Sequence, residues 1–240
     1  VPKDIDEIKT LNKKIKSNFN EITGINIPDI LRVSNRSYDA CINLAQDAIN
    51  VIPHIRMIDF SENELLALCK KLLENNVNKI LLISGDPPLN LTAPIFNHKI
   101  DQIITLIKNE LPSLSIFTAL DPYRQSLKAE IEYCHLKLQS GSDGLFTQPI
   151  FDENLVELLL NQKFDSELFI GISPVTDEKS FQYWCNRNNA FFPKSFKLSI
   201  DYNIKLAKSI IEISKSHNQH NYLMPIKTDA IDYINGIFND

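Results

Sequence analysis

The chain lacks several features, and their absence excludes some classes of function. It contains only 6 glycines in 240 residues, and none stands in a G-x-G-x-x-G or G-x-x-x-x-G-K-[ST] pattern, which argues against a glycine-rich phosphate loop. No apolar run approaches the roughly 18 residues of a membrane span. No charged start followed by an apolar stretch resembles a signal peptide. We therefore expect a cytoplasmic protein with no membrane partner.

Concentrated positive charge and paired metal ligands are also missing. Net charge is −5, from 25 basic and 30 acidic residues, and the basic residues are scattered, so the patch typical of nucleic-acid binding is absent. The four cysteines form no C-x-x-C pair and lie in apolar helical contexts, which predicts buried free thiols. His217 and His220 lie three apart without an acidic third ligand nearby. We expect no metal site and no nucleic-acid partner.

What is present is a regular alternation of apolar β-branched runs with amphipathic helical patterns, which predicts βα units around a parallel sheet. Hydrophobic residues make up 43% and charged residues 23% of the chain, as in globular proteins. The predicted strands are 24–27, 51–58, 79–84, 114–120, 144–147, 168–172 and 222–224. The predicted helices are 4–18, 38–49, 61–75, 100–109, 126–140, 153–161, 177–188, 200–216 and 229–238.

Seven such strands, with a first strand ending at Val1-Pro2 and lying mostly upstream of it, predict an α/β fold of the (β/α)8 TIM-barrel type. No linker, repeat or low-complexity block divides the chain, so we expect residues 1–240 to form a single barrel domain. A doubly wound open sheet is the alternative, and the missing glycine motifs weaken it.

In a barrel of this type the site lies at the carboxyl ends of the strands. In the strand over 51–58, alternation places Ile52, His54 and Arg56 on one face. A histidine and an arginine on an otherwise apolar strand face are costly unless they are paired or functional. Two interpretations stay open: a functional pair, or a buried histidine held by a carbonyl beside an arginine in a salt bridge.

Three further strand ends carry polar residues. Ser84, Gly85 and Asp86 follow one strand, although Gly-Asp-Pro-Pro is also an ordinary turn sequence. Thr147 and Gln148 end another strand, and Ser173 ends a third, just before a helix that carries Trp184. We expect His54, Asp86, Gln148 and Ser173 to surround one mouth.

Five motifs in this order resemble the methylenetetrahydrofolate reductase family. They are Pro53-His54-Ile55, Asp59-x-x-x-x-Glu64-Leu65, Gly85-Asp86-x-Pro88, Thr147-Gln148-x-x-Phe151-Asp152 and Gly171-Ile172-x-Pro174-Val175. The resemblance runs from about Val1 to Phe192. It implies a flavin-containing barrel of one-carbon metabolism and methionine biosynthesis, in which hydride passes from NADH or NADPH through FAD to 5,10-methylenetetrahydrofolate.

The resemblance also implies roles for individual residues. Asp86 and Gln148 would be the catalytic pair, Asp86 near flavin and pterin and Gln148 orienting the folate ring. Trp184 would stack on the folate or nicotinamide. Flavin contacts would come from His54, Ser84, Gly85, Asp86, Glu130 and Lys137. The acid that protonates folate N10 would lie two positions upstream of Val1.

Departures from the family pattern leave alternatives open. Ser84 stands where the family has a flavin-binding arginine, for which Arg32, Arg36 or Arg124 could compensate unless these are solvated loop charges. One alternative is a flavin-free folate-binding barrel that acts with a partner. Another is a different barrel enzyme of the lyase or aldolase type, with Lys137 or Lys227 as a Schiff-base nucleophile. A homo-oligomer also stays open.

Overall fold

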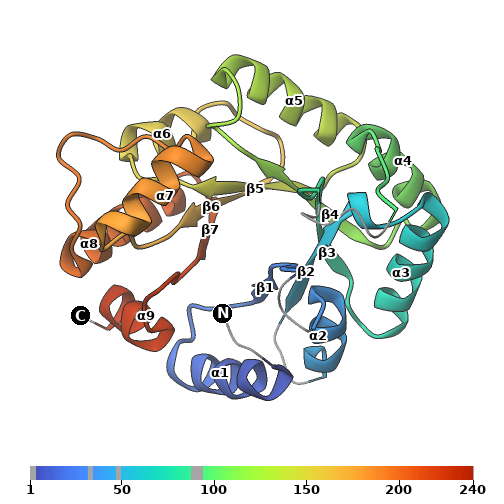
Figure 1. Ribbon diagram of the computed structural model, residues 1–240, viewed down its shortest axis with the longest axis horizontal. Helices are drawn as coiled ribbons and strands as arrows, with labels where there is room; N and C mark the ends of the chain where they lie inside the picture. The colour runs from blue at the N-terminus through green and yellow to red at the C-terminus, as the bar shows by residue number, and fades with distance from the viewer. Residues whose placement is uncertain (1–3, 32–34, 47–49, 88–93, 240) are drawn as a thin grey trace. The chain divides into compact units, whose positions relative to one another are not determined.

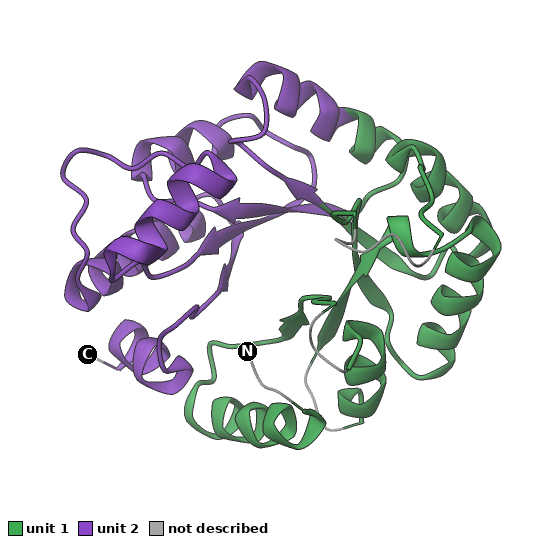
Figure 2. Ribbon diagram, in the orientation of Figure 1, with its two compact units in different colours: residues 1–118, 136–143 green, residues 119–135, 144–240 purple. Residues whose placement is uncertain are grey.

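The computed structural model describes residues 4–31, 35–46, 50–87 and 94–239. The chain falls into two compact units, the first made of residues 1–118 and 136–143 and the second of residues 119–135 and 144–240 (Figure 2). The division passes through one strand, β4 (Ser115–Leu120), and one helix, α5 (Leu127–Gln139). A single domain over residues 1–240 stays a prediction.

Helices and strands alternate along the described residues (Figure 1). The other strands are β1 (Ile25–Ile27), β2 (Val51–Arg56), β3 (Lys79–Ile83), β5 (Gly144–Pro149), β6 (Glu167–Ile172) and β7 (His220–Leu223). The other helices are α1 (Ile5–Asn18), α2 (Ser37–Leu44), α3 (Glu62–Glu74), α4 (Ile100–Glu110), α6 (Glu153–Leu160), α7 (Glu178–Asn188), α8 (Ile200–Ser216) and α9 (Ala230–Phe238). The predicted order of elements is confirmed.

All strand pairs with a defined register are parallel. In the first unit β1 pairs with β2, β2 with β3, and β3 with β4; in the second, β5 pairs with β6 and β6 with β7. Strand order therefore follows chain order, and the fold is of the predicted (β/α)8 TIM-barrel class. The expected first strand at Val1-Pro2 lies outside the described residues.

Helix α3 shows how local sequence places a helix in the first unit. Ser61 caps it and Glu64 returns a bond to the Ser61 backbone, which completes the predicted capping box. Leu65, Leu68 and Leu72 then share the buried face. This apolar stripe follows the 3.6-residue period, so the helix buries one side against the sheet and exposes the other.

In the second unit, aromatic rings fill much of the core. Phe146 of β5 stacks on Phe169 of β6 with ring centroids 4.2 Å apart. Phe151, just beyond β5, stacks on Phe192 at 4.3 Å. Trp184 of α7 meets Phe151 edge-on at 5.5 Å. Offset and edge-on contacts of this kind are the favoured aromatic geometries, and they join α7 to the end of β5.

Several predicted boundaries were wrong, among them those of β2, β5 and α2. The strand expected over 51–58 ends at Arg56, because Met57–Asp59 form a 3-10 turn closed by the Arg56–Asp59 ion pair. Strand β5 runs on to Pro149, since the adjoining Ile150 N–H still bonds the Gly171 carbonyl. Helix α2 ends at Leu44 rather than 49, and residues 47–49 lie outside the described residues. Terminal residues are where sequence patterns are least decisive.

The cysteines and the membrane prediction can be compared with the structure directly. All four cysteines are free, and Cys41, Cys69 and Cys134 are buried as predicted, whereas Cys185 is partly exposed. Among the described residues, no helix has the length and apolar character that crossing a membrane requires. No cluster of three potential metal ligands occurs in that same part of the chain.

Candidate active site

His54 lies near the carboxyl end of β2 and is held on both sides. Its Nε2 is 3.1 Å from the Asn26 side-chain oxygen, and its backbone carbonyl accepts a 2.5 Å bond from the Ser37 hydroxyl. Burial lowers the pKa of His54 to about 4, with Asp29 acting in the opposite direction. His54 is therefore a neutral imidazole at pH 7. Its place beside a flavin stays a prediction.

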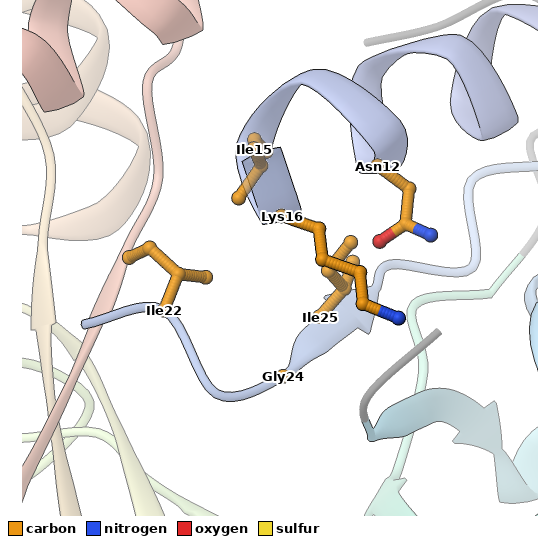
Figure 3. Close-up of a pocket in the computed structure, with 6 residues that line it drawn as sticks. All are labelled: Asn12, Ile15, Lys16, Ile22, Gly24 and Ile25. Carbon is orange, nitrogen blue, oxygen red and sulfur yellow. The ribbon is translucent and has the colours of Figure 1, made fainter. Parts of the chain in front are cut away.

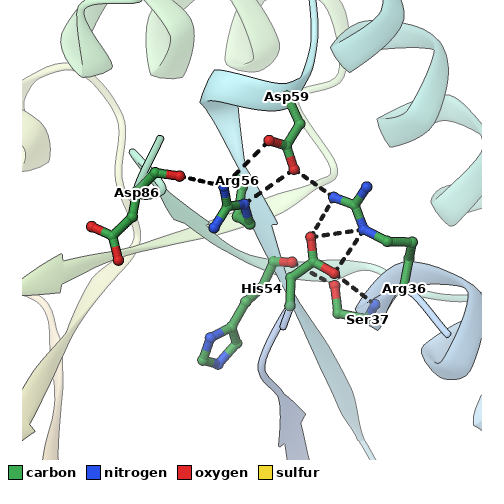
Figure 4. Close-up of polar contacts among 7 residues, drawn as sticks. Arg36, Ser37, His54, Arg56, Asp59 and Asp86 are labelled. Carbon is green, nitrogen blue, oxygen red and sulfur yellow. Dashed lines mark hydrogen bonds and ion pairs between the residues drawn. The ribbon is translucent and has the colours of Figure 1, made fainter. Parts of the chain in front are cut away.

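Arg56 has an ionic partner, as one of the two sequence interpretations required. Its Nε lies 3.1 Å from Asp59 Oδ2. The same carboxylate oxygen lies 2.6 Å from Nη2 of Arg36, which also binds Asp29 (Figure 4). Two arginines and two aspartates thus alternate in one chain of ion pairs. We call Asp29, Arg36, Asp59 and Arg56 the ion-pair chain.

Two of the arginines considered as substitutes for the missing family arginine, Arg36 and Arg124, are ion-paired. Arg36 is ion-paired, and its hydrogen bond with Asp29 raises its pKa against the effect of burial. Arg124 pairs with the fully covered carboxylate of Glu130 at 2.6 Å. The interpretation of solvated loop charge was wrong for Arg36, which is largely covered and holds the buried carboxylate of Asp29. Arg124 is exposed to solvent as well as ion-paired. Arg32 lies outside the described residues.

The Ser84-Gly85-Asp86 turn follows β3. Gly85 has a φ of +84°, and a Cβ there would lie 2.8 Å from Ile58 Cγ2, so the turn requires glycine. Ser84 and Asp86 are exposed. The Asp86 carboxylate makes no hydrogen bond within the described residues, and it points away from the Arg56 guanidinium (Figure 4). The turn therefore presents an exposed carboxylate at a strand end, where the sequence predicted one.

Glu130 of α5 is occupied by groups of its own chain. It accepts hydrogen bonds from the Asp121 backbone at 3.0 Å, from Gln125 at 2.8 Å and from Arg124 at 2.6 Å. Its side chain has no exposed surface. Lys137, further along α5, is also buried, at 2% exposed. The flavin contacts predicted for both residues stay predictions.

Gln148 differs from its neighbour Thr147 at the end of β5. The Thr147 hydroxyl donates to the Gln148 carbonyl at 2.7 Å and accepts from the Gly171 amide at 2.8 Å, and the Tyr222 hydroxyl bonds the Thr147 carbonyl. The Gln148 side chain is half-buried and has no hydrogen-bond partner among the described residues. Thr147 is thus used for structure, whereas no described residue bonds the Gln148 amide, and its role in binding a ligand stays a prediction.

Ser173 and Trp184 lie in the second unit as well. Ser173 is buried and donates a 2.9 Å bond to the Met224 carbonyl, which ties the end of β6 to the end of β7. Trp184 is only 4% exposed and packs on Phe151. Most of its indole surface is therefore covered by the chain itself. A stacking role for Trp184 stays a prediction.

The structure brings together His54, Arg56 and the Asp86 turn in the first unit. Gln148, Ser173, Glu130 and Trp184 belong to the second unit, and one mouth shared by both sets stays a prediction. Sequence reasoning missed Asn26, Ser37 and the ionic role of Asp29. The ionic role of Asp59 was missed too, because an i,i+3 pair with Arg56 needs a helical or turn backbone, which the strand predicted over 51–58 hides.

One recess lies away from these strand ends, at the start of β1 (Figure 3). It is a small recess open to solvent, and it is lined by Asn12, Ile15, Lys16, Ile22, Gly24 and Ile25. Its lining is mostly aliphatic, and it lies at the amino end of its strand. Conserved chemistry in barrels of this class gathers at the opposite ends of the strands, so this recess is not the candidate site.

Comparison with known proteins connects this geometry to a family. Two solved structures are similar in fold alone. A structure of oxaloacetate acetylhydrolase has a TM-score of 0.60 at 11% identity and covers 97% of this chain and 76% of its own. A structure of 2,3-dimethylmalate lyase has a TM-score of 0.57 at 8% identity and covers 90% of this chain and 70% of its own. The 5,10-methylenetetrahydrofolate reductase of Escherichia coli is 23% identical over 152 residues, covering 60% of this chain and 51% of that protein. The corresponding protein of Buchnera aphidicola subsp. Baizongia pistaciae is 22% identical over 151 residues, which cover 61% of this chain and 51% of that protein.

The chain thus spans about half the length of the curated relatives it matches. A profile of the methylenetetrahydrofolate reductase family covers much more of it, matching residues 4–214. That span includes most of both units, the ion-pair chain, the Asp86 turn and Gln148. The chain belongs to the methylenetetrahydrofolate reductase family.

Proposed function

We propose that this protein is a methylenetetrahydrofolate reductase-type oxidoreductase that binds a reduced folate and adds hydride to 5,10-methylenetetrahydrofolate. Family membership supports the reaction class. The single observation that carries the proposal is the exposed Asp86 carboxylate, which is presented on a glycine-dependent turn at the end of β3 and has no partner in the described residues. A strand end is where barrel enzymes of this class place reacting groups.

Asp86 and Gln148 have the chemistry that a pterin needs. The ring edge of a pterin offers amino and ring N–H donors beside a carbonyl acceptor. A carboxylate such as Asp86 accepts from two donors at once, and an amide such as Gln148 supplies N–H donors beside a carbonyl acceptor. We assign Asp86 to the donor edge of a reduced folate and Gln148 to an edge that needs both kinds of bond.

The flavin implied by the family fits one part of the predicted contact set. Ser84, Gly85 and Asp86 are accessible at the end of β3 and would hold it, whereas Glu130 has all its hydrogen bonds within the chain. Bound FAD would supply the hydride, replenished by NADH or NADPH. The chain's own residues would orient the folate and exclude water from it.

His54 limits how protons move at this site. Its pKa of about 4 leaves it neutral at physiological pH, so it does not supply the proton that folate N10 needs as the substrate ring opens. A neutral imidazole bonded to Asn26 serves to orient a neighbour. We assign His54 to positioning, and the acid to another group.

Calorimetry with 5-methyltetrahydrofolate tests the folate assignment. Asp86→Asn and Gln148→Ala should each weaken binding about tenfold, the effect of losing roughly 1.4 kcal/mol. Asp165→Asn, which changes another exposed aspartate, is the matched control and should bind normally. Normal affinity in both site variants would remove the pterin assignment.

The visible spectrum of the protein, purified with added FAD, tests the flavin separately. Absorption near 450 nm that stays with the protein through gel filtration supports the reductase. The saturated Glu130 favours a second candidate, a flavin-free folate-binding barrel. Folate binding without any retained flavin would establish that candidate instead.

A further inference from the structure

We propose that Arg56 is a positioning residue for Asp86: its guanidinium holds the backbone of the turn after β3 and thereby aims the Asp86 carboxylate. The inference rests on the proposed function in one respect, since it takes Asp86 as the ligand-binding group. Its geometric part, that Arg56 orders the turn, stands on contacts within the first unit alone.

The central contact is a hydrogen bond from Arg56 Nη2 to the Asp86 backbone carbonyl, at 2.5 Å across thirty positions of sequence. Arg56 itself is 8% exposed. A charge-assisted bond in a covered position is stronger than an ordinary amide bond in water. The bond holds the peptide of Asp86 and leaves its carboxylate free, as the opposite directions of carbonyl and carboxylate in Figure 4 show.

The guanidinium is itself fixed in place from the other side. Arg56 Nε and Nη2 both reach Asp59, at 3.1 and 3.4 Å, and Asp59 is bound in turn by Arg36. The planar fork of arginine can serve an aspartate and a carbonyl at once, which the single ammonium of lysine does less rigidly. The ion-pair chain therefore links the end of β1 to the turn after β3.

Among the described residues, few other contacts hold the backbone of this turn. Ser84 accepts a 3.1 Å backbone bond from Ile58, and Gly85 approaches the arginine so closely that a Cβ would lie 3.0 Å from Arg56 Cβ. Beyond Ser84, the described contact that fixes the backbone of Asp86 is the one from Arg56. Removing it should release the residue that carries the carboxylate.

The first readout needs no ligand. Nitrogen-15 relaxation of the Gly85 and Asp86 amides should show a clear loss of order in Arg56→Met, for example order parameters falling from about 0.85 to below 0.6. Arg56→Lys should restore order partly. Lys108→Met is the matched control, because Lys108 also bonds an aspartate and a backbone carbonyl, Asp143 and Leu114, at the other end of the sheet.

The second readout is a double-mutant cycle on the affinity for 5-methyltetrahydrofolate. Arg56→Met should weaken binding about tenfold in the wild-type background and have no further effect in Asp86→Asn. Lys108→Met should leave the affinity unchanged. Thermal melts of every variant check that the compared proteins are folded. If Arg56→Met does not fold, Arg56→Lys takes its place in the cycle.

Two results would overturn the inference: unchanged relaxation at Gly85 and Asp86 in the folded Arg56 variant, or an equal loss of affinity in the wild-type and Asp86→Asn backgrounds. If the proposed function itself is wrong, the experiments give a different result. In that case the wild-type protein binds no reduced folate, while the relaxation measurement still decides whether Arg56 orders the turn.

Discussion

Arg36 holds both carboxylate oxygens of Asp29, with Nε 2.9 Å from Oδ1 and Nη2 2.5 Å from Oδ2. The Asp29 side chain has no exposed surface, so this guanidinium is what makes its burial tolerable. The same nitrogen, Nη2, also reaches Asp59 at 2.6 Å. One arginine thus bridges two carboxylates in the first unit, and Arg56 supplies the second positive charge.

Removing Arg36 should be costly because it strands a buried charge. We expect Arg36→Met to lower the free energy of unfolding by about 3–5 kcal/mol. The double variant Asp29→Asn/Arg36→Met should lose less than Arg36→Met alone, since no unpaired carboxylate remains. Urea denaturation measures all of them. Lys71→Met, which breaks an exposed pair with Asp39, should cost at most about 1 kcal/mol.

His54 should make the protein less stable in mild acid. Its pKa is about 4 when folded and near 6.5 when unfolded, so between these values the unfolded chain binds more protons. The contribution of His54 to the free energy of unfolding is fully present above pH 6.5. It is lost as the pH falls towards 4, by up to about 3 kcal/mol.

The measurement compares stability at pH 7 and pH 4.5 in the wild type and in His54→Gln. The variant should lose distinctly less stability over this interval than the wild type. His220→Gln, at an exposed histidine, should behave as the wild type does. Equal losses in all three proteins would show that His54 does not set this pH dependence.

Gly85→Ala should harm both stability and ligand binding. The substitution places a side chain at φ +84° and 2.8 Å from Ile58 Cγ2, and such strain costs about 1–3 kcal/mol. Gly141→Ala is the control, because Gly141 has a φ of +110° at the opposite ends of the strands. Both variants should melt earlier, but only Gly85→Ala should bind 5-methyltetrahydrofolate more weakly. Equal affinity of Gly85→Ala and Gly141→Ala for 5-methyltetrahydrofolate would show that the Gly85 turn is not part of the binding site.

Trp184 should matter for the core of the second unit. Its indole is 4% exposed and packs on Phe151, so Trp184→Ala should cost about 3–5 kcal/mol in guanidinium denaturation. Trp184→Phe keeps an aromatic ring and should cost less. Tyr183→Ala, at the exposed neighbouring ring, should have little effect. A Trp184→Ala protein of normal stability would contradict the packing described here.

Several features could be predicted from sequence because their causes are local. The capping box of Ser61 and Glu64 and the stripe at Leu65, Leu68 and Leu72 depend on spacing within one helix. The position of Asp86 directly after a buried strand likewise follows from the order of residues. The end of β2 could not be predicted, since the chain stops being a strand where Asp59 turns back onto Arg56.

The sequence by itself determined the alternation of strands and helices, the barrel class and the family, because hydrophobic period and motif order are written along the chain. Tertiary structure alone decided which polar groups are used up and which are free. Glu130 and Thr147 satisfy their bonds internally, whereas the Asp86 carboxylate and the Gln148 amide have no partner in the part of the chain that the structure describes. Partners such as Asp29 for Arg36, or the Asp86 carbonyl for Arg56, come from other elements of the fold. No periodicity in the sequence records such pairings, since they depend on how strand ends meet.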